Sequence, residues 1–131
     1  MTVLGQHTGG LVLYAILCYS DEDTVWSWTK EEDAAVMGRL AVVRERLAPI
    51  MGPSARLLPT TAATTLRKSP EPVVIDGPYA ETKEQLLGFY VIDVQNLDAA
   101  LDVARQLTAA NPGGAYEIRP IALYQPDKRA S

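Results

Sequence analysis

The sequence contains few of the residues that most often build reactive or metal-binding sites. It has one cysteine, Cys18, and one histidine, His7, among its 131 residues. A single cysteine excludes a disulfide within the chain and suits a reducing, cytoplasmic location. Without a cluster of histidines and cysteines at ligand spacing, a zinc or iron site has no support. We therefore expect a cytoplasmic protein with no bound metal, in which Cys18 is a buried apolar residue.

The sequence also lacks an excess of positive charge and a long hydrophobic run. Lys and Arg number 12 against 16 Asp and Glu, a net charge of −4, whereas nucleic-acid binding needs clustered basic residues. The apolar run Leu11–Tyr19 is too short to cross a bilayer and has no basic segment before it. Gly5, Gly9 and Gly10 do not connect a strand to a helix, as a nucleotide-binding loop would. These absences predict no nucleic acid, no membrane and no cofactor.

A single domain is what this length allows, with a flexible leader at 1–10, the domain at 11–124 and a tail at 125–131. The run Leu11–Tyr19 predicts a strand that is apolar on both alternating faces, and such a strand needs cover on two sides. Helices supply one cover. Because the chain has few helices, we expect a second copy to supply the other, in a homodimer.

Two helices are predicted from their start signals. Thr29 and Glu32 have the spacing of a capping box, and Asn96 is a good N-cap residue for a second helix. Gly52-Pro53 is expected to end the first helix. The side chains expected to face inward are Val36, Met37, Leu40, Val43 and Leu47 on the first helix and Leu97, Ala100, Leu101, Ala104 and Leu107 on the second.

Further strands are predicted where β-branched and aromatic residues gather between turns. They span Arg56–Leu58, Thr64–Lys68, Val73–Ile75, Leu87–Val94 and Ala115–Tyr124. The second and third of these, joined by a proline-containing turn, favour a hairpin. The order of strand, helix, strands, helix and strand predicts a two-layer α+β domain with both helices on one face of the sheet.

The loop Asp76-Gly77-Pro78-Tyr79 is the most distinctive motif. With Ala80–Asp93 after it, Thr64–Arg67 before it and Glu117–Ile121 further on, it resembles the YCII-related family, in the branch known for Asp-Gly-Pro-Phe. The resemblance implies a ferredoxin-like fold of the dimeric α/β barrel type, in which two antiparallel sheets pack face to face. It implies no settled activity. Other branches carry a His-Asp pair after the first strand, but residues 20–32 contain no histidine, so that dyad does not transfer.

The motif loop carries enough chemistry for proton transfer. Asp76 and Glu81 offer carboxylates as bases, Lys83 a cation to stabilise developing negative charge, and Tyr79 a phenol for the substrate. The structural alternative is that Asp76 caps the turn while Glu81 and Lys83 are surface charges. The residue types leave both alternatives open.

The last predicted strand adds a second group. Alternation places Glu117 and Arg119 on one face. Arg119 suits a substrate carboxylate or enolate, whereas the alternative is a salt bridge between the two residues across a subunit interface. Tyr19 and Tyr90, together with Tyr14 and Phe89, are expected to form an aromatic wall for the ligand.

These patterns favour a small molecule bound in a sheet-facing cavity of a dimer, with cofactor-free lyase or isomerase chemistry by proton transfer. The alternative is a non-catalytic dimer that binds a ligand or a regulatory protein. Trp26 and Trp28 would then form a docking edge with the acidic loop Asp21–Asp23. We interpret that loop as an exposed run of charge rather than a magnesium site.

Overall fold

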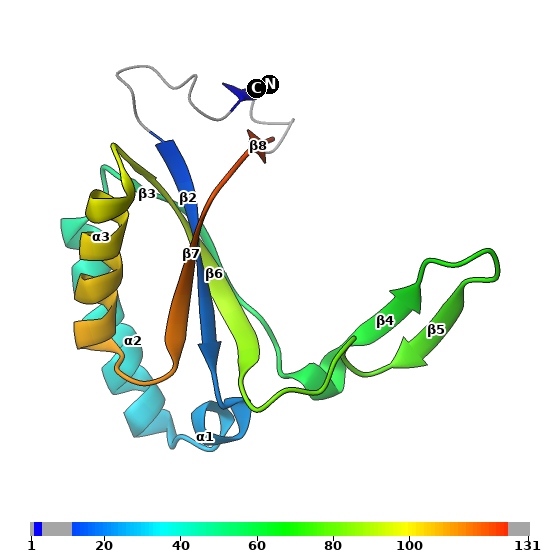
Figure 1. Cartoon of the computed structure of the whole chain (residues 1–131). Coiled ribbons are helices and arrows are strands. Elements are labelled where there is room, and N and C mark those ends of the chain that lie inside the picture. Colours follow the sequence, from blue (N-terminus) through cyan, green and yellow to red (C-terminus); the bar gives the residue numbers. More distant parts are fainter. Residues whose placement is uncertain (1, 4–11, 126–131) are drawn as a thin grey trace.

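An antiparallel four-stranded sheet forms the centre of the structure, a computed structural model that describes residues 2–3 and 12–125 (Figure 1). The strand order is β3-β6-β2-β7, so the first and third strands of the sheet in sequence lie in the middle. The four strands are β2 (Val12–Ser20), β3 (Met51–Arg56), β6 (Gln85–Val94) and β7 (Ala115–Pro120).

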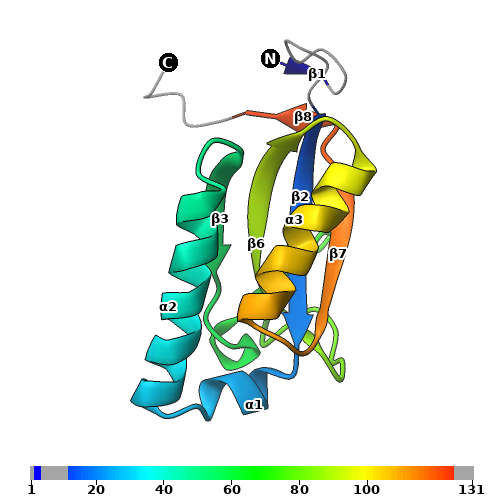
Figure 2. The ribbon, with the colours of Figure 1, turned by 90° about the vertical axis from the view of Figure 1, so that its left-hand side faces the viewer.

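Two long helices, α2 (Lys30–Arg46) and α3 (Leu97–Ala110), cover one face of this sheet, and the short helix α1 (Glu22–Trp26) lies at its end (Figure 2). The predicted two-layer α+β architecture is therefore confirmed. With the arm described below set aside, the order of strand, helix, two strands, helix and strand is compatible with a ferredoxin-like fold.

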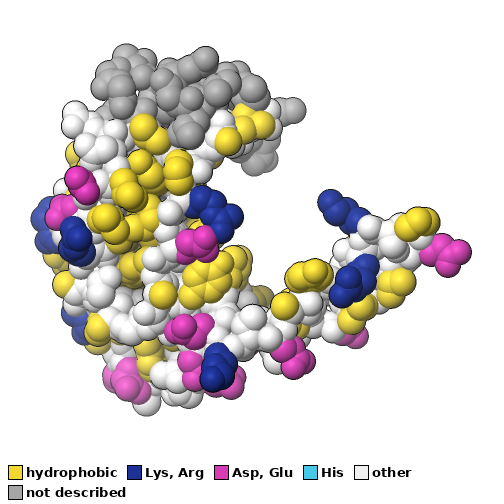
Figure 3. All heavy atoms as spheres, in the orientation of Figure 1, with side chains coloured by type: hydrophobic (Ala, Val, Ile, Leu, Met, Phe, Trp, Pro, Cys, Tyr) yellow, Lys and Arg dark blue, Asp and Glu magenta, His cyan; other side chains and the backbone are white. Residues whose placement is uncertain are grey.

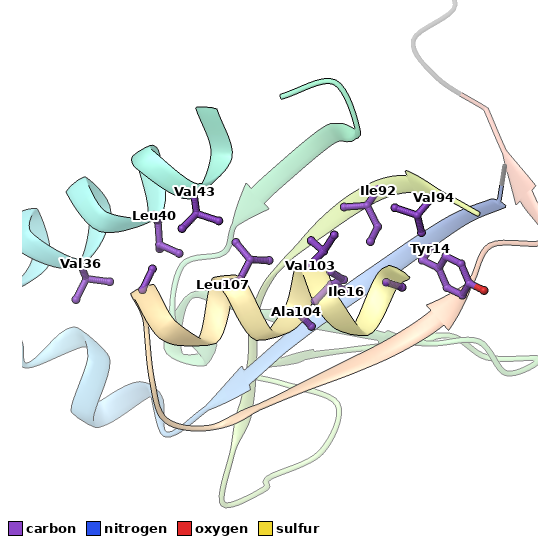
Figure 4. Packing of buried hydrophobic residues seen from close by; sticks show 12 residues of the cluster. Tyr14, Ile16, Val36, Leu40, Val43, Ile92, Val94, Val103, Ala104 and Leu107 are labelled. Carbon is purple, nitrogen blue, oxygen red and sulfur yellow. The ribbon is translucent and has the colours of Figure 1, made fainter. Parts of the chain in front are cut away.

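The hydrophobic core lies between the sheet and the two long helices (Figure 4). Ile16, Ile92 and Leu107 are completely or almost completely enclosed. They come from β2, β6 and α3, so segments far apart in the sequence meet in one layer. The buried cluster consists of Tyr14, Ile16, Val36, Leu40, Val43, Ile92, Val94, Ala100, Val103, Ala104, Leu107 and Ala110.

Helix α2 begins as its capping box predicts. The Glu32 amide donates to the Thr29 hydroxyl at 3.0 Å, and the Thr29 amide donates to the Glu32 carboxylate at 3.0 Å. Val36, Leu40 and Val43 are buried at helical spacing. The prediction that Met37 joins them is wrong, because its side chain lies on the exposed side of the helix.

The predicted end of this helix at Gly52-Pro53 is also wrong. The helix ends at Arg46, and Gly52 and Pro53 belong to β3. Strand β3 is at the edge of the sheet, where a residue without an amide hydrogen is tolerated. Its pairing with β6 is irregular between Met51 and Ser54, the stretch that contains the proline.

Helix α3 is capped by Asn96, whose side chain accepts a hydrogen bond from the Ala99 amide at 2.9 Å. Ala100, Ala104 and Leu107 face inward as predicted, whereas Leu97 is half exposed in the first turn. Val103 and Ala110 complete the buried stripe and were not in the predicted set.

The predicted hairpin is confirmed but lies outside the central sheet. Strands β4 (Thr64–Arg67) and β5 (Val73–Asp76) pair with each other and with no other strand of the described residues. They project from the molecule on the side opposite the helices (Figure 1). We call residues 64–76 the arm. The strand predicted at Arg56–Leu58 is instead the end of β3, prolonged by a hydrogen bond of 2.8 Å from the Leu57 amide to the Leu87 carbonyl.

The last predicted strand is divided. Strand β7 ends at Pro120, and β8 (Leu123–Tyr124) pairs with β1 (Thr2–Val3) instead of the central sheet. The rest of the predicted leader, including His7, and the tail beyond 125 lie outside the described residues. None of the helices among the described residues has the length and hydrophobicity of a membrane span.

Candidate functional site

The face of the sheet opposite α2 and α3, here called the open face, carries the polar pair predicted on the last strand. In the strand register, Leu17 of β2 lies between Phe89 of β6 and Glu117 of β7. Arg119 lies opposite Ala15 in the same register. Alternation therefore places an acid and a base beside apolar side chains on the open face.

The opposite set of β7 side chains faces the helices. Tyr116 and Ile118 pack against the core cluster, so the predicted division of this strand into two faces is confirmed. Burial raises the pKa of the Tyr116 phenol, with smaller contributions from Cys18 and Tyr90. The phenol is therefore neutral at physiological pH and suited to packing rather than to proton transfer.

The acid and base on the open face bond to each other within one chain. The Arg119 guanidinium donates to the Glu117 carboxylate. This hydrogen bond raises the pKa of Arg119, as do the charge of Glu117 and, to a smaller extent, Tyr19. The Arg119 side chain is still 65% exposed, so its guanidinium is accessible to an anion. The predicted salt bridge therefore forms inside the protomer and needs no subunit interface.

The predicted aromatic wall is split between the two faces of the sheet. Phe89 shares the open face with Leu17, and Tyr19 lies close enough to Arg119 to influence its pKa. Tyr14 and Tyr90 instead pack on the helix side. Burial raises the pKa of Tyr90, Cys18 raises it further, and Arg44 lowers it. The structure thus brings Tyr19 to the open-face pair and does not bring Tyr90 there.

Cys18 is on the helix side of β2, where it pairs in register with Tyr116. Burial raises the pKa of its thiol to about 12. Because the thiolate is the nucleophile, a thiol that holds its proton to such high pH is inert at neutral pH. Its location agrees with the prediction of a largely buried apolar residue.

The motif loop is fixed to the base of the arm. Gly77 has a φ of 104°, which disfavours any residue with a Cβ atom. Its amide donates to the Ala63 carbonyl at 2.7 Å, and its carbonyl accepts from the Thr65 hydroxyl at 2.8 Å. Asp76 ends β5 opposite Thr64 and is exposed. The loop therefore serves first as a rigid turn.

A shallow groove of about 390 Å³ lies beside this turn. It offers three threonine hydroxyls, one amide side chain and one carboxylate. Glu81 is the only predicted catalytic residue among those that line it. The lining residues are Thr60, Thr61, Gly77, Pro78, Ala80, Glu81, Thr82 and Gln85.

The other residues predicted for the motif chemistry lie outside the groove. Tyr79 is 74% exposed, and the Arg67 guanidinium lies over its ring at 5.4 Å from the centroid. Lys83 and Asp76 are exposed on the surface. Of the three predicted catalytic residues, Glu81 lines the groove and Asp76 and Lys83 do not.

Glu22 is a buried carboxylate that the sequence did not reveal. It is 9% exposed, and its carboxylate accepts from the Thr60 amide at 2.8 Å and from the Thr60 hydroxyl. The Glu22 amide donates to the Gln85 side-chain oxygen at 3.0 Å. Glu22 is thus hydrogen-bonded to two residues that line the groove, Thr60 and Gln85. The prediction that the whole acidic loop is exposed is wrong for its middle residue.

The signals around Glu22 explain why it was missed. Helix α1 has five residues, too few to show a periodic apolar face. Its neighbours behave as expected of an acidic loop, since Asp21 caps the helix by accepting from the Asp23 amide at 3.1 Å and both are exposed. Nothing in the spacing separates the buried carboxylate from the exposed ones.

The two tryptophans of the predicted docking edge also differ. Trp26 is exposed, with the Arg56 guanidinium 4.9 Å from its ring centroid. Trp28 is partly buried and packs against the core. Only Trp26 is placed to contact a partner.

Comparison with known proteins identifies the family. The sequence model described as the YCII-related domain matches residues 12–125, nearly the whole described chain. The chain belongs to the YCII-related family. A protein of Rhizobium meliloti (strain 1021), described as uncharacterised, is 57% identical over 124 residues, which cover 92% of this chain and 100% of that protein. The resemblance to the YCII-related family is confirmed, and neither comparison supplies an activity.

This YCII-related protein therefore presents two separate polar centres. One is the exposed Glu117–Arg119 pair on the open face, and the other is the groove with Glu81 at the foot of the arm. Among the residues that the structure describes, no three His, Cys, Asp or Glu side chains converge as metal ligands would. An accessible guanidinium beside apolar side chains is suited to hold a carboxylate or enolate.

Proposed function

We propose that this protein binds a small organic anion on the open face of the sheet, enclosed by a second copy of the chain. The observation that carries the proposal is the accessible Arg119 on the same face as Leu17 and Phe89, on a sheet that helices cover on one side only. The dimer is of the dimeric α/β barrel type associated with the Asp-Gly-Pro-Phe branch. The single cysteine suits a cytoplasmic location.

The enclosing second copy follows from the hydrophobic effect. Strand β2 carries apolar residues on both faces, and α2 and α3 shield only one of them. Packing two open faces together removes apolar surface from water, which contributes about 25 cal/mol per Å². Water excluded from such a cavity also strengthens the attraction between Arg119 and an anion, because the local dielectric constant falls.

The side chains on the open face indicate the class of ligand. Arg119 forms one bidentate contact with a carboxylate or enolate, at the expense of its bond to Glu117. Leu17 and Phe89 suit an apolar or aromatic remainder. The ligand is therefore compact, with one negative group and little other polarity.

Cofactor-independent proton transfer, as in a lyase or an isomerase, is the second candidate function. Its support is the Glu81 carboxylate, which lines the groove beside threonine hydroxyls. A non-catalytic role as a ligand-binding or regulatory dimer is favoured over it, because Asp76 and Lys83 stand outside that groove. Substituting Glu81→Gln separates the two, since it removes turnover without removing ligand binding at the open face.

The proposal is tested by a thermal-shift screen of small carboxylic acids. A ligand at one hundred times its dissociation constant stabilises the folded protein by about 2.7 kcal/mol. We expect Arg119→Ala to abolish the shift and Arg119→Lys to weaken it, because lysine lacks the bidentate fork. Glu117→Ala is the matched control and should retain or strengthen binding. A shift that survives in Arg119→Ala would contradict the assigned site.

A further inference from the structure

The arm exposes apolar surface that the protomer does not use. Leu66 and Val74 are paired across its two strands and are 56% and 67% exposed. Val73 and Ile75, which alternate with Val74 along β5, are exposed as well. Two-stranded hairpins are marginal in water unless another layer covers them. The arm therefore has apolar side chains on both faces and no cover within the described chain.

The base of the arm is nevertheless hydrogen-bonded to the rest of the protomer, here called the body. The Gly77 amide bonds to the Ala63 carbonyl, and the Thr65 hydroxyl bonds to the Gly77 carbonyl. One step further back, Glu22 holds Thr60 at the start of the short 3-10 helix that leads into the arm. These contacts set the direction of the arm before any partner arrives, which lowers the entropy lost on association.

The direction of the arm matches the open face. The arm extends on the side of the sheet away from α2 and α3, and the surface is hollowed between arm and sheet (Figure 3). Apolar side chains continue to its foot, where Leu58 is 71% exposed and Leu57 is also exposed. A body seated on the open face therefore lies within reach of the arm.

We infer that the arm clasps the second copy that covers the open face, an inference that rests on the proposed dimer. The exposed apolar side chains of the arm and its foot would add to the open face in reaching the ~800 Å² per partner that a standard interface buries. They are Leu57, Leu58, Leu66, Val73, Val74, Ile75 and Tyr79.

A second copy fits the arm better than an unrelated protein. In a two-fold interface the same patch of each subunit contacts the other subunit. The arm of each chain would therefore be covered by its partner, and no arm would be left exposed. The arm also carries two basic residues, Arg67 and Lys68, and two acidic residues, Glu71 and Asp76, so its net charge is zero. A neutral arm meets an acidic copy of the same chain without net repulsion.

The test compares two exposed valines. Val74→Lys places a charge on the arm, whereas Val42→Lys places the same charge on α2 at a site 61% exposed on the helix side. Because both side chains are exposed in the protomer, both variants should fold, which circular dichroism confirms. We expect sedimentation equilibrium to show the dimer dissociation constant raised about tenfold or more by Val74→Lys and changed less than about twofold by Val42→Lys.

Hydrogen exchange of the β4 and β5 amides measures independently whether the arm is covered in the dimer. We expect their amides to be protected in the wild-type dimer and to exchange quickly in Val74→Lys at the same concentration. Equal dissociation constants for the two variants, or a dimer whose arm exchanges freely, would overturn the clasp while leaving the dimer intact. A wild-type protein that stays monomeric would overturn the clasp and the proposed function together.

Discussion

The body and the arm of this molecule are stabilised in opposite ways. In the body, residues such as Ile16 and Leu107 are completely enclosed between the sheet and its helices. In the arm, Leu66 and Val74 are more than half exposed, and hydrogen bonds between two short strands hold the backbone. The helix-side core of the body is covered within the protomer, whereas the apolar side chains of the arm have no cover there and call for another surface against them.

The polar residues follow the same division. Inside the body, ionisable groups such as Cys18 and Tyr116 are held neutral by burial. The carboxylate of Glu22, at the boundary between body and arm, is buried and accepts its hydrogen bonds from Thr60. The accessible charges that suit a ligand, Arg119 and Glu81, lie on the open face and at the foot of the arm. Ligand contacts are thus expected on the open face and at the foot of the arm.

The largest effect should come from the core. Leu107→Ala removes a side chain with no exposed surface and should lower the free energy of unfolding by about 2–5 kcal/mol. Leu66→Ala makes the same chemical change on the arm and should cost less than about 0.5 kcal/mol in dilute protein. Urea unfolding of both variants measures the difference. Equal losses would mean that the arm belongs to the cooperative core.

The boundary residue should give the next largest effect. Glu22→Ala leaves the amide and hydroxyl of Thr60 without their partner and should cost about 1–3 kcal/mol. Amide exchange near Ala63 and Gly77 should also accelerate, because the base of the arm loses its brace. Glu84→Ala, at an exposed glutamate, is the control and should change neither quantity. Unchanged exchange in Glu22→Ala would show that the arm is held without it.

Two glycines should respond with opposite sign to the same substitution. Gly77→Ala at the foot of the arm forces a Cβ onto a φ of 104° and should destabilise by about 1–2 kcal/mol, although the space around it is open. Gly38→Ala lies inside α2, also in open space, and should stabilise by about 0.5–1 kcal/mol. Thermal and urea unfolding report both signs. A stabilising Gly77→Ala would remove the argument for a rigid turn.

The smallest effect on stability at neutral pH is expected from the buried thiol of Cys18, because it titrates only at alkaline pH. Burial raises the pKa of Cys18 from an ordinary 9.0 to about 12 in the folded protein. Between these values the unfolded chain has lost this proton and the folded chain has kept it, so the free energy of unfolding falls as pH rises above about 9. The raised pKa values of Tyr90 and Tyr116 act in the same direction.

This pH dependence is measured by urea unfolding at a series of pH values from neutral to strongly alkaline. Cys18→Ala should flatten the decline without abolishing it, because the two tyrosines remain. Val42→Cys in the Cys18→Ala background places a thiol on the exposed side of α2 and should restore no such decline. A Cys18→Ala protein with an unchanged slope would show that the thiol is not shielded.

The sequence predicted the elements of the body well because their signals are local. The capping residues Thr29 and Asn96 mark the helix starts, and helical spacing picks out Leu40 and Leu107. It failed at Gly52-Pro53, because a turn signal and an edge strand have the same composition and only the neighbouring strand decides between them. Pairing β4 with β5 was predictable, but their separation from the central sheet depends on long-range contacts.

The candidate site was less predictable, for a related reason. Alternation correctly separated Arg119 from Tyr116, because a strand has a fixed period. Alternation also puts the adjacent Phe89 and Tyr90 on opposite faces, so the division of the aromatic wall was predictable from the sequence. The burial of Glu22 depends on contact with Thr60, 38 residues away, and has no signature in the nearby sequence.

We expect a second copy to cover the open face and the arm. Sedimentation equilibrium of the wild-type protein at micromolar concentration measures this association. It should show a species of twice the protomer mass, which Val74→Lys shifts toward the monomer and Val42→Lys does not. A stable monomer over the whole concentration range would contradict it.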